Sequence, residues 1–157
     1  MVQRIALLGF AERCSFRNGV IAHRIGRALG VRGVTLVCGN NRETFYHAMR
    51  GASSAFRSFR CQEIVTSDLL PSALTDSPIL ASSSLEKHRL ISNYADAAIV
   101  VGGGRQTLKL VDRFLSGGKK VAVVINTGGV VRWELPSWIP RYRSETDAVN
   151  FLCGGSR

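Results

Sequence analysis

Apolar residues along the chain gather in short continuous runs, and a segment with helical spacing follows most of them. The runs predict strands at Arg4–Phe10, Val34–Gly39, Cys61–Val65, Asp96–Gly102 and Lys119–Ile125. These runs are apolar throughout instead of alternating with polar residues. That pattern is typical of parallel strands whose sheet is covered on both faces.

The segments between these strands have the periodicity of helices. In the first of them Ile21, Ile25 and Leu29 share one face, and Gly30 and Gly33 end the helix. Further helices are predicted at residues 40–52, 84–95, 105–118 and 147–152.

Strands that alternate with helices predict an α/β fold. We expect residues 1–157 to form a single Rossmann-like domain, with a mostly parallel sheet and helices on both faces. Residues 66–84 contain two prolines and many serines, so they are expected to be mostly loop, as a flap. Residues 126–157 are expected to extend the same domain at its C-terminal end.

The chain is basic, with a formal net charge of +10 and a sequence pI of about 10.3. That charge favours anionic partners such as nucleotides, RNA or DNA, although no block of like charges appears. No apolar run approaches the roughly 18–20 residues that span a bilayer, so no membrane partner is expected. The first apolar run is too short for a signal peptide, and we expect a soluble cytoplasmic protein.

The four cysteines lie far apart at Cys14, Cys38, Cys61 and Cys153. Without a C-x-x-C pair, neither a metal site nor a disulfide framework is expected. The interpretation is that they are small buried apolar residues, with some reactivity left open for Cys14 because it lies in a predicted loop.

Three predicted strands end in glycine followed by polar residues, at Gly9, Gly39 and Gly102–Gly104. Ligands of open α/β sheets bind beyond the carboxyl ends of the strands. Glycine lets a backbone approach a ligand closely, and the N–H groups of a following helix bind phosphate. The glycine-rich loop after the fourth predicted strand is therefore the expected phosphate site, with a charge from Arg105 and a hydroxyl from Thr107.

Two well-known phosphate motifs are missing. The stretch "GGGRQT" matches the first two glycines of G-x-G-x-x-G and has Thr107 at the third, and no G-x-x-x-x-G-K-[ST] occurs. The chain is therefore neither a typical NAD domain nor a P-loop NTPase.

The stretch "LEKHRLISNYADAAIVVGGGRQTLKLVDRFL" resembles the centre of the Lonely Guy-like (LOG) proteins, often called lysine-decarboxylase-like. Their pattern has an arginine and then "ADAxIVLPGGxGTxxE". Arg89 matches the arginine, Asp96 begins the strand, and Gly103, Gly104 and Thr107 match the loop. The resemblance runs from about Ile5 to Ile125, and it extends to the wider SLOG superfamily of molybdenum-cofactor carriers and DprA.

The resemblance implies a loop that holds the phosphate and ribose of a nucleotide, and enzymes that split a nucleoside monophosphate. It implies a catalytic role for Arg89, but the motif's glutamate position is Leu110, its proline is Gly102 and its last glycine is Gln106. A leucine side chain cannot transfer a proton. Asp112 is turned about 200° away on a helix, and Glu12 is the remaining acid that could reach the pocket from another loop.

The candidate residues for binding ligand and phosphate lie at the ends of the predicted strands. They are Gly9, Phe10, Gly39, Asn40, Gly102, Gly103, Gly104, Arg105, Gln106, Thr107 and Thr127. His47 and His88 are interpreted as surface or packing residues.

Three functions stay open at this point. The first is binding of a nucleotide or nucleotide-derived ligand, with the catalytic glutamate missing. The second is N-glycosidic hydrolysis or transfer on a nucleoside monophosphate, and the third is nucleic-acid binding or a ribonucleoprotein role with a degenerate pocket. A homodimer is implied by the resemblance alone, and no cofactor beyond a nucleotide is expected.

Overall fold

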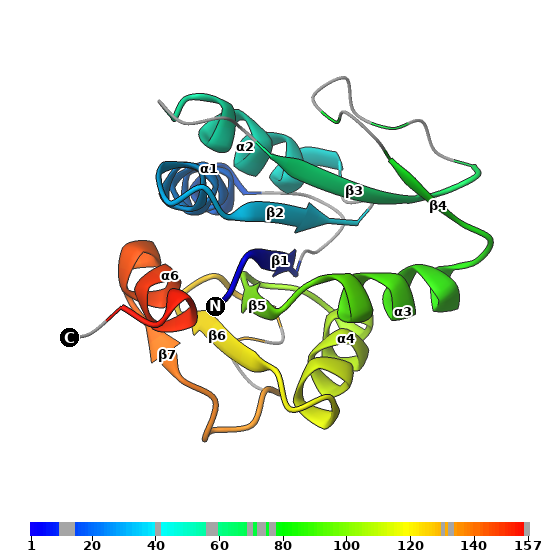
Figure 1. The fold of residues 1–157 in the computed structure, drawn as a ribbon. Helices are drawn as coiled ribbons and strands as arrows, with labels where there is room; N and C mark the ends of the chain where they lie inside the picture. Colours follow the sequence, from blue (N-terminus) through cyan, green and yellow to red (C-terminus); the bar gives the residue numbers. More distant parts are fainter. Residues whose placement is uncertain are drawn as a thin grey trace.

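A parallel sheet of seven strands organises the chain, in the order β4-β3-β2-β1-β5-β6-β7 (Figure 1). The structure is a computed structural model that describes residues 1–9, 15–39, 42–55, 60–68, 71, 75, 78–129, 131 and 134–155. The strands are β1 (Arg4–Leu8), β2 (Thr35–Cys38), β3 (Cys61–Thr66), β4 (Ile79–Ala81), β5 (Ala97–Val100), β6 (Lys120–Val124) and β7 (Arg141–Tyr142). Every neighbouring pair is parallel, so the predicted α/β fold with a parallel sheet is confirmed.

The strand order reverses at β1. The chain moves outward through β2, β3 and β4, and then returns to pair β5 with the free side of β1. At such a switch point the connections leave the carboxyl ends of the two strands in opposite directions and open a crevice between them. The ends of β1 and β5 therefore mark where a ligand site is expected.

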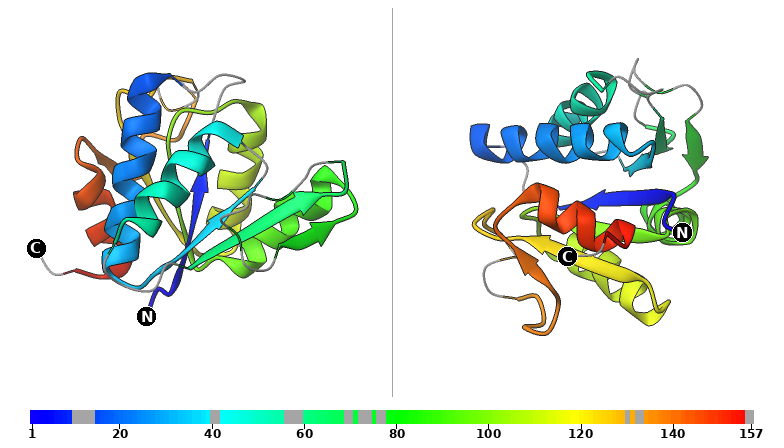
Figure 2. Two further views of the ribbon diagram at one scale, coloured as in Figure 1. Left: turned by 90° about the horizontal axis from the view of Figure 1, so that it is seen from above. Right: turned by 60° about the vertical axis from the view of Figure 1, so that its left-hand side comes forward.

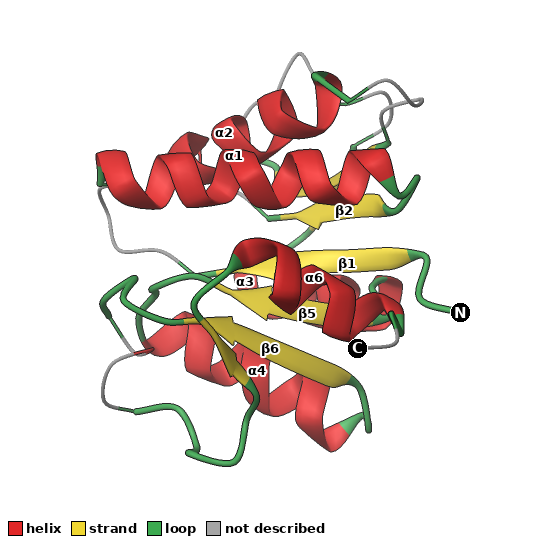
Figure 3. Cartoon of the chain, turned by 90° about the vertical axis from the view of Figure 1, so that its left-hand side faces the viewer, coloured by secondary structure: helices red, strands yellow, loops and turns green. Residues whose placement is uncertain are grey.

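Helices cover both faces of the sheet, as predicted. One face packs against α1 (Phe16–Val31), α2 (Arg42–Ser53) and α6 (Glu145–Cys153). The other packs against α3 (Ser84–Tyr94) and α4 (Arg105–Ser116). Figure 3 shows α6 in front of the strands and α4 behind them. The alternation of side chains along β1 explains the two cores, because Ile5 and Leu7 enter one and Ala6 and Leu8 the other.

The helices α1 and α2 pack backbone against backbone (Figure 2). A Cβ on Gly26 would lie 1.8 Å from the backbone oxygen of Ala48, and one on Gly51 would lie 1.9 Å from that of His23. Both distances are far below contact range, so only glycine fits at these two positions. This close packing fixes α1 and α2 relative to each other.

Two strands were not predicted. β4 lies in the segment 66–84 that was expected to be mostly loop, and β7 lies in the C-terminal extension. They have three and two residues, too few to show a hydrophobic period. The other expected elements are present with boundaries shifted by a few residues, and most of residues 69–77, where the flap was expected, lie outside the described residues.

The two described core cysteines are free and buried. Cys38 and Cys61 lie on adjacent strands with 3.4 Å between their sulfur atoms. Burial raises the pKa of the Cys38 thiol well above its usual value. Within the described part of the chain no group of three or more His, Cys, Asp or Glu side chains could hold a metal ion, and no helix is both long and apolar enough to cross a membrane.

Candidate functional site

The glycine loop after β5 has a backbone that side chains would rarely tolerate. Gly102 has φ +62° and Gly103 has φ +104°, both in the left-handed region that favours glycine. A Cβ on Gly103 would also lie 2.3 Å from the hydroxyl of Thr107. These two residues turn the chain from β5 directly into α4.

The helix α4 begins at this loop, with Gly104 as its N-cap. Gly104 supplies no side chain to cap the helix, and its own N–H donates to Thr107 Oγ1 at 3.3 Å. The N–H groups in the first turn of a helix have no partner within the helix. The start of α4 therefore presents hydrogen-bond donors and the positive end of the helix dipole.

The hydroxyl of Thr127 holds the loop against the end of β6. Gly102 N donates to Thr127 Oγ1 at 2.8 Å, and that hydroxyl donates to the backbone oxygen of Val124 at 2.8 Å. The side-chain amide of Asn18, in the first turn of α1, donates to the backbone oxygen of Thr127 at 3.0 Å. The ends of β5 and β6 and the start of α1 are thereby joined.

Gly9, at the end of β1, lies directly against the same loop. It has φ +125°, and a Cβ there would lie 1.9 Å from the backbone oxygen of Val101. The close approach brings the ends of β1 and β5 together at the switch point.

A cavity of about 160 Å³ opens on the α3 and α4 side of this junction. Its lining combines apolar and polar residues. The lining residues are Leu7, Leu8, Gly9, Gly39, Phe45, Lys87, His88, Ile91, Gln106, Thr107 and Leu110.

The charged groups of the cavity are cationic. Lys87 is half-buried, and burial lowers the pKa of its ammonium against the opposing effect of Asp68. His88 is only 7% exposed. Burial lowers the pKa of its imidazole, and the nearby charges of Lys87, Arg113 and Lys109 lower it further. Among the described residues no carboxylate lines this cavity, so a bound anion would supply the missing counter-charge.

Several predicted site residues meet at this cavity. Gly9, Gly39, Gln106 and Thr107 line it, and Gly102–Gly104 form the loop that leads into the same turn of α4. Arg105 is exposed and does not line it, and the hydroxyl of Thr127 is bonded within the protein. Phe10 and Asn40 lie outside the described residues.

The two positions matched to the catalytic residues of the resemblance lie differently. Leu110 lines the cavity and is 8% exposed. Arg89 lies on the outer side of α3, where its side chain is 62% exposed and forms an ion pair of 3.6 Å with Glu86. Its catalytic role stays a prediction. Asp112 is exposed, and Glu12 lies outside the described residues.

Comparison with known proteins gives no match in sequence but a clear match in structure. No family model and no curated protein matches the chain. The molybdenum cofactor carrier protein of Chlamydomonas reinhardtii is similar with a TM-score of 0.79 and 19% identity, over 98% of this chain and 99% of that one. The molybdenum cofactor binding protein of the phototrophic bacterium Rippkaea orientalis has a TM-score of 0.83 and 19% identity, over 98% and 97%.

DNA processing protein A of Helicobacter pylori, described as binding single-stranded DNA, is also similar. It has a TM-score of 0.74 and 13% identity, over 99% of this chain and 83% of that one. The chain shares the fold of these proteins. The Rossmann-like fold that the sequence resemblance implied is therefore confirmed across nearly the whole chain.

Sequence reasoning missed several residues of the cavity. Phe45 and Lys87 were not considered, and His88 was interpreted as a surface or packing residue. His88 and Ile91 are three positions apart on α3 and so share a face, with Lys87 beside them. That spacing is a signal, but it points to the cavity only once the side of the sheet that α3 covers is known.

Proposed function

We propose that this protein binds a small phosphorylated ligand at the carboxyl edge of its sheet, without hydrolysing it. The observation that carries the proposal is a cavity that Lys87 and the basic side chain of His88 line and that, among the described residues, no carboxylate lines. It lies beside the N-terminus of α4. Helix N-termini and ammonium groups both favour phosphate.

The phosphate would lie on the first turn of α4, at Gly104 and Thr107, with Lys87 as its counter-charge. The apolar wall of Phe45, Ile91 and Leu110 suits a planar ring or the carbon face of a sugar. The cavity volume of about 160 Å³ is below the roughly 300–1,000 Å³ of common ligand pockets. It would hold one part of the ligand, with the rest on the surface.

The class of ligand follows from these groups. A nucleotide or a phosphorylated pterin offers both a phosphate and a planar ring. The similar proteins from C. reinhardtii and R. orientalis are described as carrying or binding the molybdenum cofactor, and they support including pterin phosphates beside nucleotides.

Binding without hydrolysis is proposed because Leu110 stands at the position where the resemblance requires a glutamate. Leucine can neither protonate a leaving group nor stabilise a positive charge on a sugar ring. Incubation with the common nucleoside monophosphates should therefore release no free base. Release of base from any of them, detected by chromatography, would favour the hydrolase.

The test of binding is a change at Gly104. A Cβ there would meet nothing within 4 Å, and its extended backbone accepts any residue. Gly104→Asp supplies a preferred N-cap, so the folded protein should be as stable as the wild type or a few tenths of a kcal/mol more stable. Its carboxylate would occupy and repel the phosphate site.

The measurement is calorimetric titration with inorganic phosphate, AMP, GMP, ADP-ribose and a pterin phosphate. Gly104→Asn is the matched control, since it has the same shape without the charge. Affinity for the ligand that binds wild type should fall at least about tenfold in Gly104→Asp and less in Gly104→Asn, because a like charge near an anion costs more than 1 kcal/mol at short range. Equal affinity in all three proteins would reject this site.

A further inference from the structure

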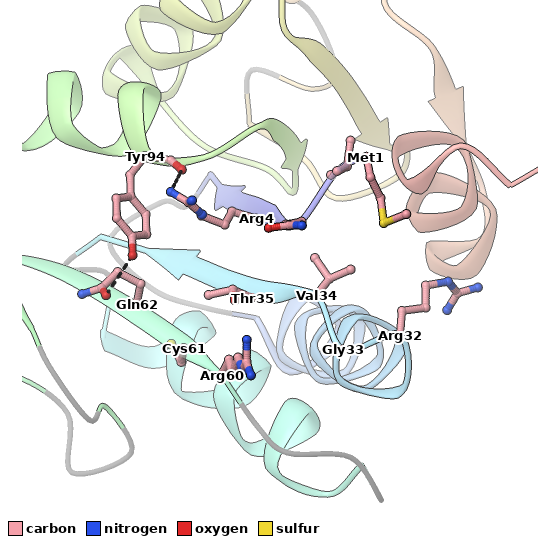
Figure 4. A pocket seen from close by; sticks show the side chains of 12 residues that line it. Met1, Arg4, Arg32, Gly33, Val34, Thr35, Arg60, Cys61, Gln62 and Tyr94 are labelled. Atoms are coloured by element: carbon pink, nitrogen blue, oxygen red, sulfur yellow. Dashed lines mark hydrogen bonds between the residues drawn. The ribbon is translucent and has the colours of Figure 1, made fainter.

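A second and larger pocket lies at the opposite, amino edge of the sheet (Figure 4). Its volume is about 590 Å³, and it is lined by residues that precede or begin β1, β2 and β3 and by Tyr94 at the end of α3. In the part of the chain that the structure describes, it shares no lining residue with the cavity at the carboxyl edge. Any ligand here would be bound independently of the proposed function.

Three arginines surround this pocket from different elements. Arg4 begins β1, Arg32 follows α1, and Arg60 precedes β3 (Figure 4). Among the described residues that line the pocket, none is acidic. The carboxylate of Asp96, just before β5, accepts hydrogen bonds of 2.9 Å from the backbone N–H groups of Gln3 and Arg4.

Two of the arginines also bond to helix ends, and this use leaves most of their donors free. Arg4 donates to the backbone oxygen of Tyr94 at 3.3 Å, and Arg32 donates to that of Ala28 at 3.0 Å and to the side chain of Asn150. A guanidinium carries five N–H donors, so these bonds do not exhaust either group. The Arg60 side chain is exposed and forms no ion pair or hydrogen bond with the described residues.

Uncharged groups lie between the arginines. The Arg4 guanidinium stacks on the Tyr94 ring with 4.6 Å between its carbon and the ring centroid. The Tyr94 hydroxyl donates to the Gln62 amide oxygen at 3.5 Å (Figure 4). Thr35 adds a hydroxyl to the same wall. Arginines interleaved with an aromatic ring and an amide are suited to phosphates and bases that are not paired.

We propose that this amino-edge pocket binds a single strand of nucleic acid, with Arg60, Arg32 and Arg4 on its phosphates. The volume of about 590 Å³ lies within the roughly 300–1,000 Å³ of small-ligand pockets, so it admits a nucleotide of a flexible strand. A duplex backbone is too stiff to enter a concave site of this size. The net charge of +10 would draw such a polyanion to the surface.

The test is fluorescence-anisotropy titration of a labelled oligothymidylate over a series of salt concentrations. The variants are Arg60→Glu and Arg27→Glu, which make the same change of charge. Arg27 is exposed on the outer side of α1, away from this pocket. Both substitutions are on the surface, and equal melting temperatures would show that both variants fold.

Arg60→Glu should weaken binding at least about tenfold and lower the salt slope by about one, while Arg27→Glu should change either little. Gly104→Asp at the other edge should bind the strand as wild type does, so failure of one proposal is distinguishable from failure of the other. Excess AMP should compete weakly if several phosphates are bound, and strongly if the pocket takes only a mononucleotide. Equal loss in Arg60→Glu and Arg27→Glu, strong competition by AMP, or no binding by wild type would overturn the proposal.

Discussion

The two edges of the sheet are both cationic, and they reach that state by different means. At the carboxyl edge the helix α4 begins, and its backbone N–H groups add to the partly buried charge of Lys87. At the amino edge α1 and α3 end, and their carbonyl groups are negative. Arg4 and Arg32 donate hydrogen bonds to these carbonyls, and, within the described residues, further N–H donors of both guanidinium groups stay free.

The two sites should therefore respond differently to salt. Partly buried charges and fixed backbone dipoles are screened little, whereas exposed guanidinium groups are screened strongly. The carboxyl edge is suited to holding one small anion in a defined position. The amino edge is suited to a longer anion that gains affinity from several exposed contacts.

Alanine substitutions at two glycines, one at each edge of the sheet, should differ most in the free energy of unfolding. Gly9→Ala should destabilise the protein by about 3 kcal/mol or more, because strain at positive φ adds to a collision with the backbone. Its Cβ would lie 1.9 Å from the oxygen of Val101. Gly33→Ala, at φ +67° with nothing within 4 Å, should cost about 1 kcal/mol.

Urea denaturation of both variants measures the two free energies of unfolding. Equal losses of unfolding free energy in the two variants would show that the ends of β1 and β5 can separate at little cost. The close approach of Gly9 to Val101 would then contribute little to stability.

A smaller effect should distinguish two lysines near the carboxyl edge. Lys87 lines the cavity, while Lys109 is exposed on α4 and does not. Lys87→Gln should lower the affinity for the phosphorylated ligand about tenfold, because a charged hydrogen bond contributes about 1.5 kcal/mol. Lys109→Gln should lower it less than about threefold. Calorimetric titration of both variants decides this, and equal affinities would remove Lys87 from the site.

The smallest expected change is in how the stability of the protein depends on pH. Burial and nearby cations lower the pKa of His88 below the usual histidine value of 6.5. The unfolded chain therefore binds more protons than the folded protein just below pH 6.5, and stability should fall as pH falls through this range. His88→Gln should flatten this part of the profile.

Urea midpoints measured above and below pH 6.5 test the wild type against His88→Gln. A bound anion should reduce the dependence in the wild type, since it stabilises the protonated ring. Identical profiles for the two proteins would show that His88 titrates alike in the folded and unfolded states.

The sequence predicted the fold well because continuous apolar runs and helical periods can be recognised without knowing which segments pack together. The strands β4 and β7 escaped because elements of three and two residues have no period. The glycine loop could be located because its residues are consecutive. Lys87 could not be located in this way. Its side chain lies at the cavity only because α3 packs near Gly39, which the sequence alone does not show.

Arg89 and Leu110 illustrate the limit of motif spacing. The spacing placed Leu110 correctly beside the loop, since both belong to α4 and its start. Arg89 belongs to a different helix, and its direction depends on how α3 rotates over the sheet. The amino-edge pocket was beyond the sequence altogether, because Arg4, Arg32 and Arg60 come together only through the pairing of β1, β2 and β3.

The single hydroxyl of Thr127 gives the carboxyl edge a built-in reporter. The Gly102 amide donates to it, so that amide can exchange its hydrogen for solvent deuterium only when β5 and β6 part at their ends. Its hydrogen-exchange rate therefore measures local opening of the loop at a single residue, while the rest of the sheet stays closed. A ligand on the first turn of α4 would lower the exchange rate of the Gly102 amide without contacting Thr127.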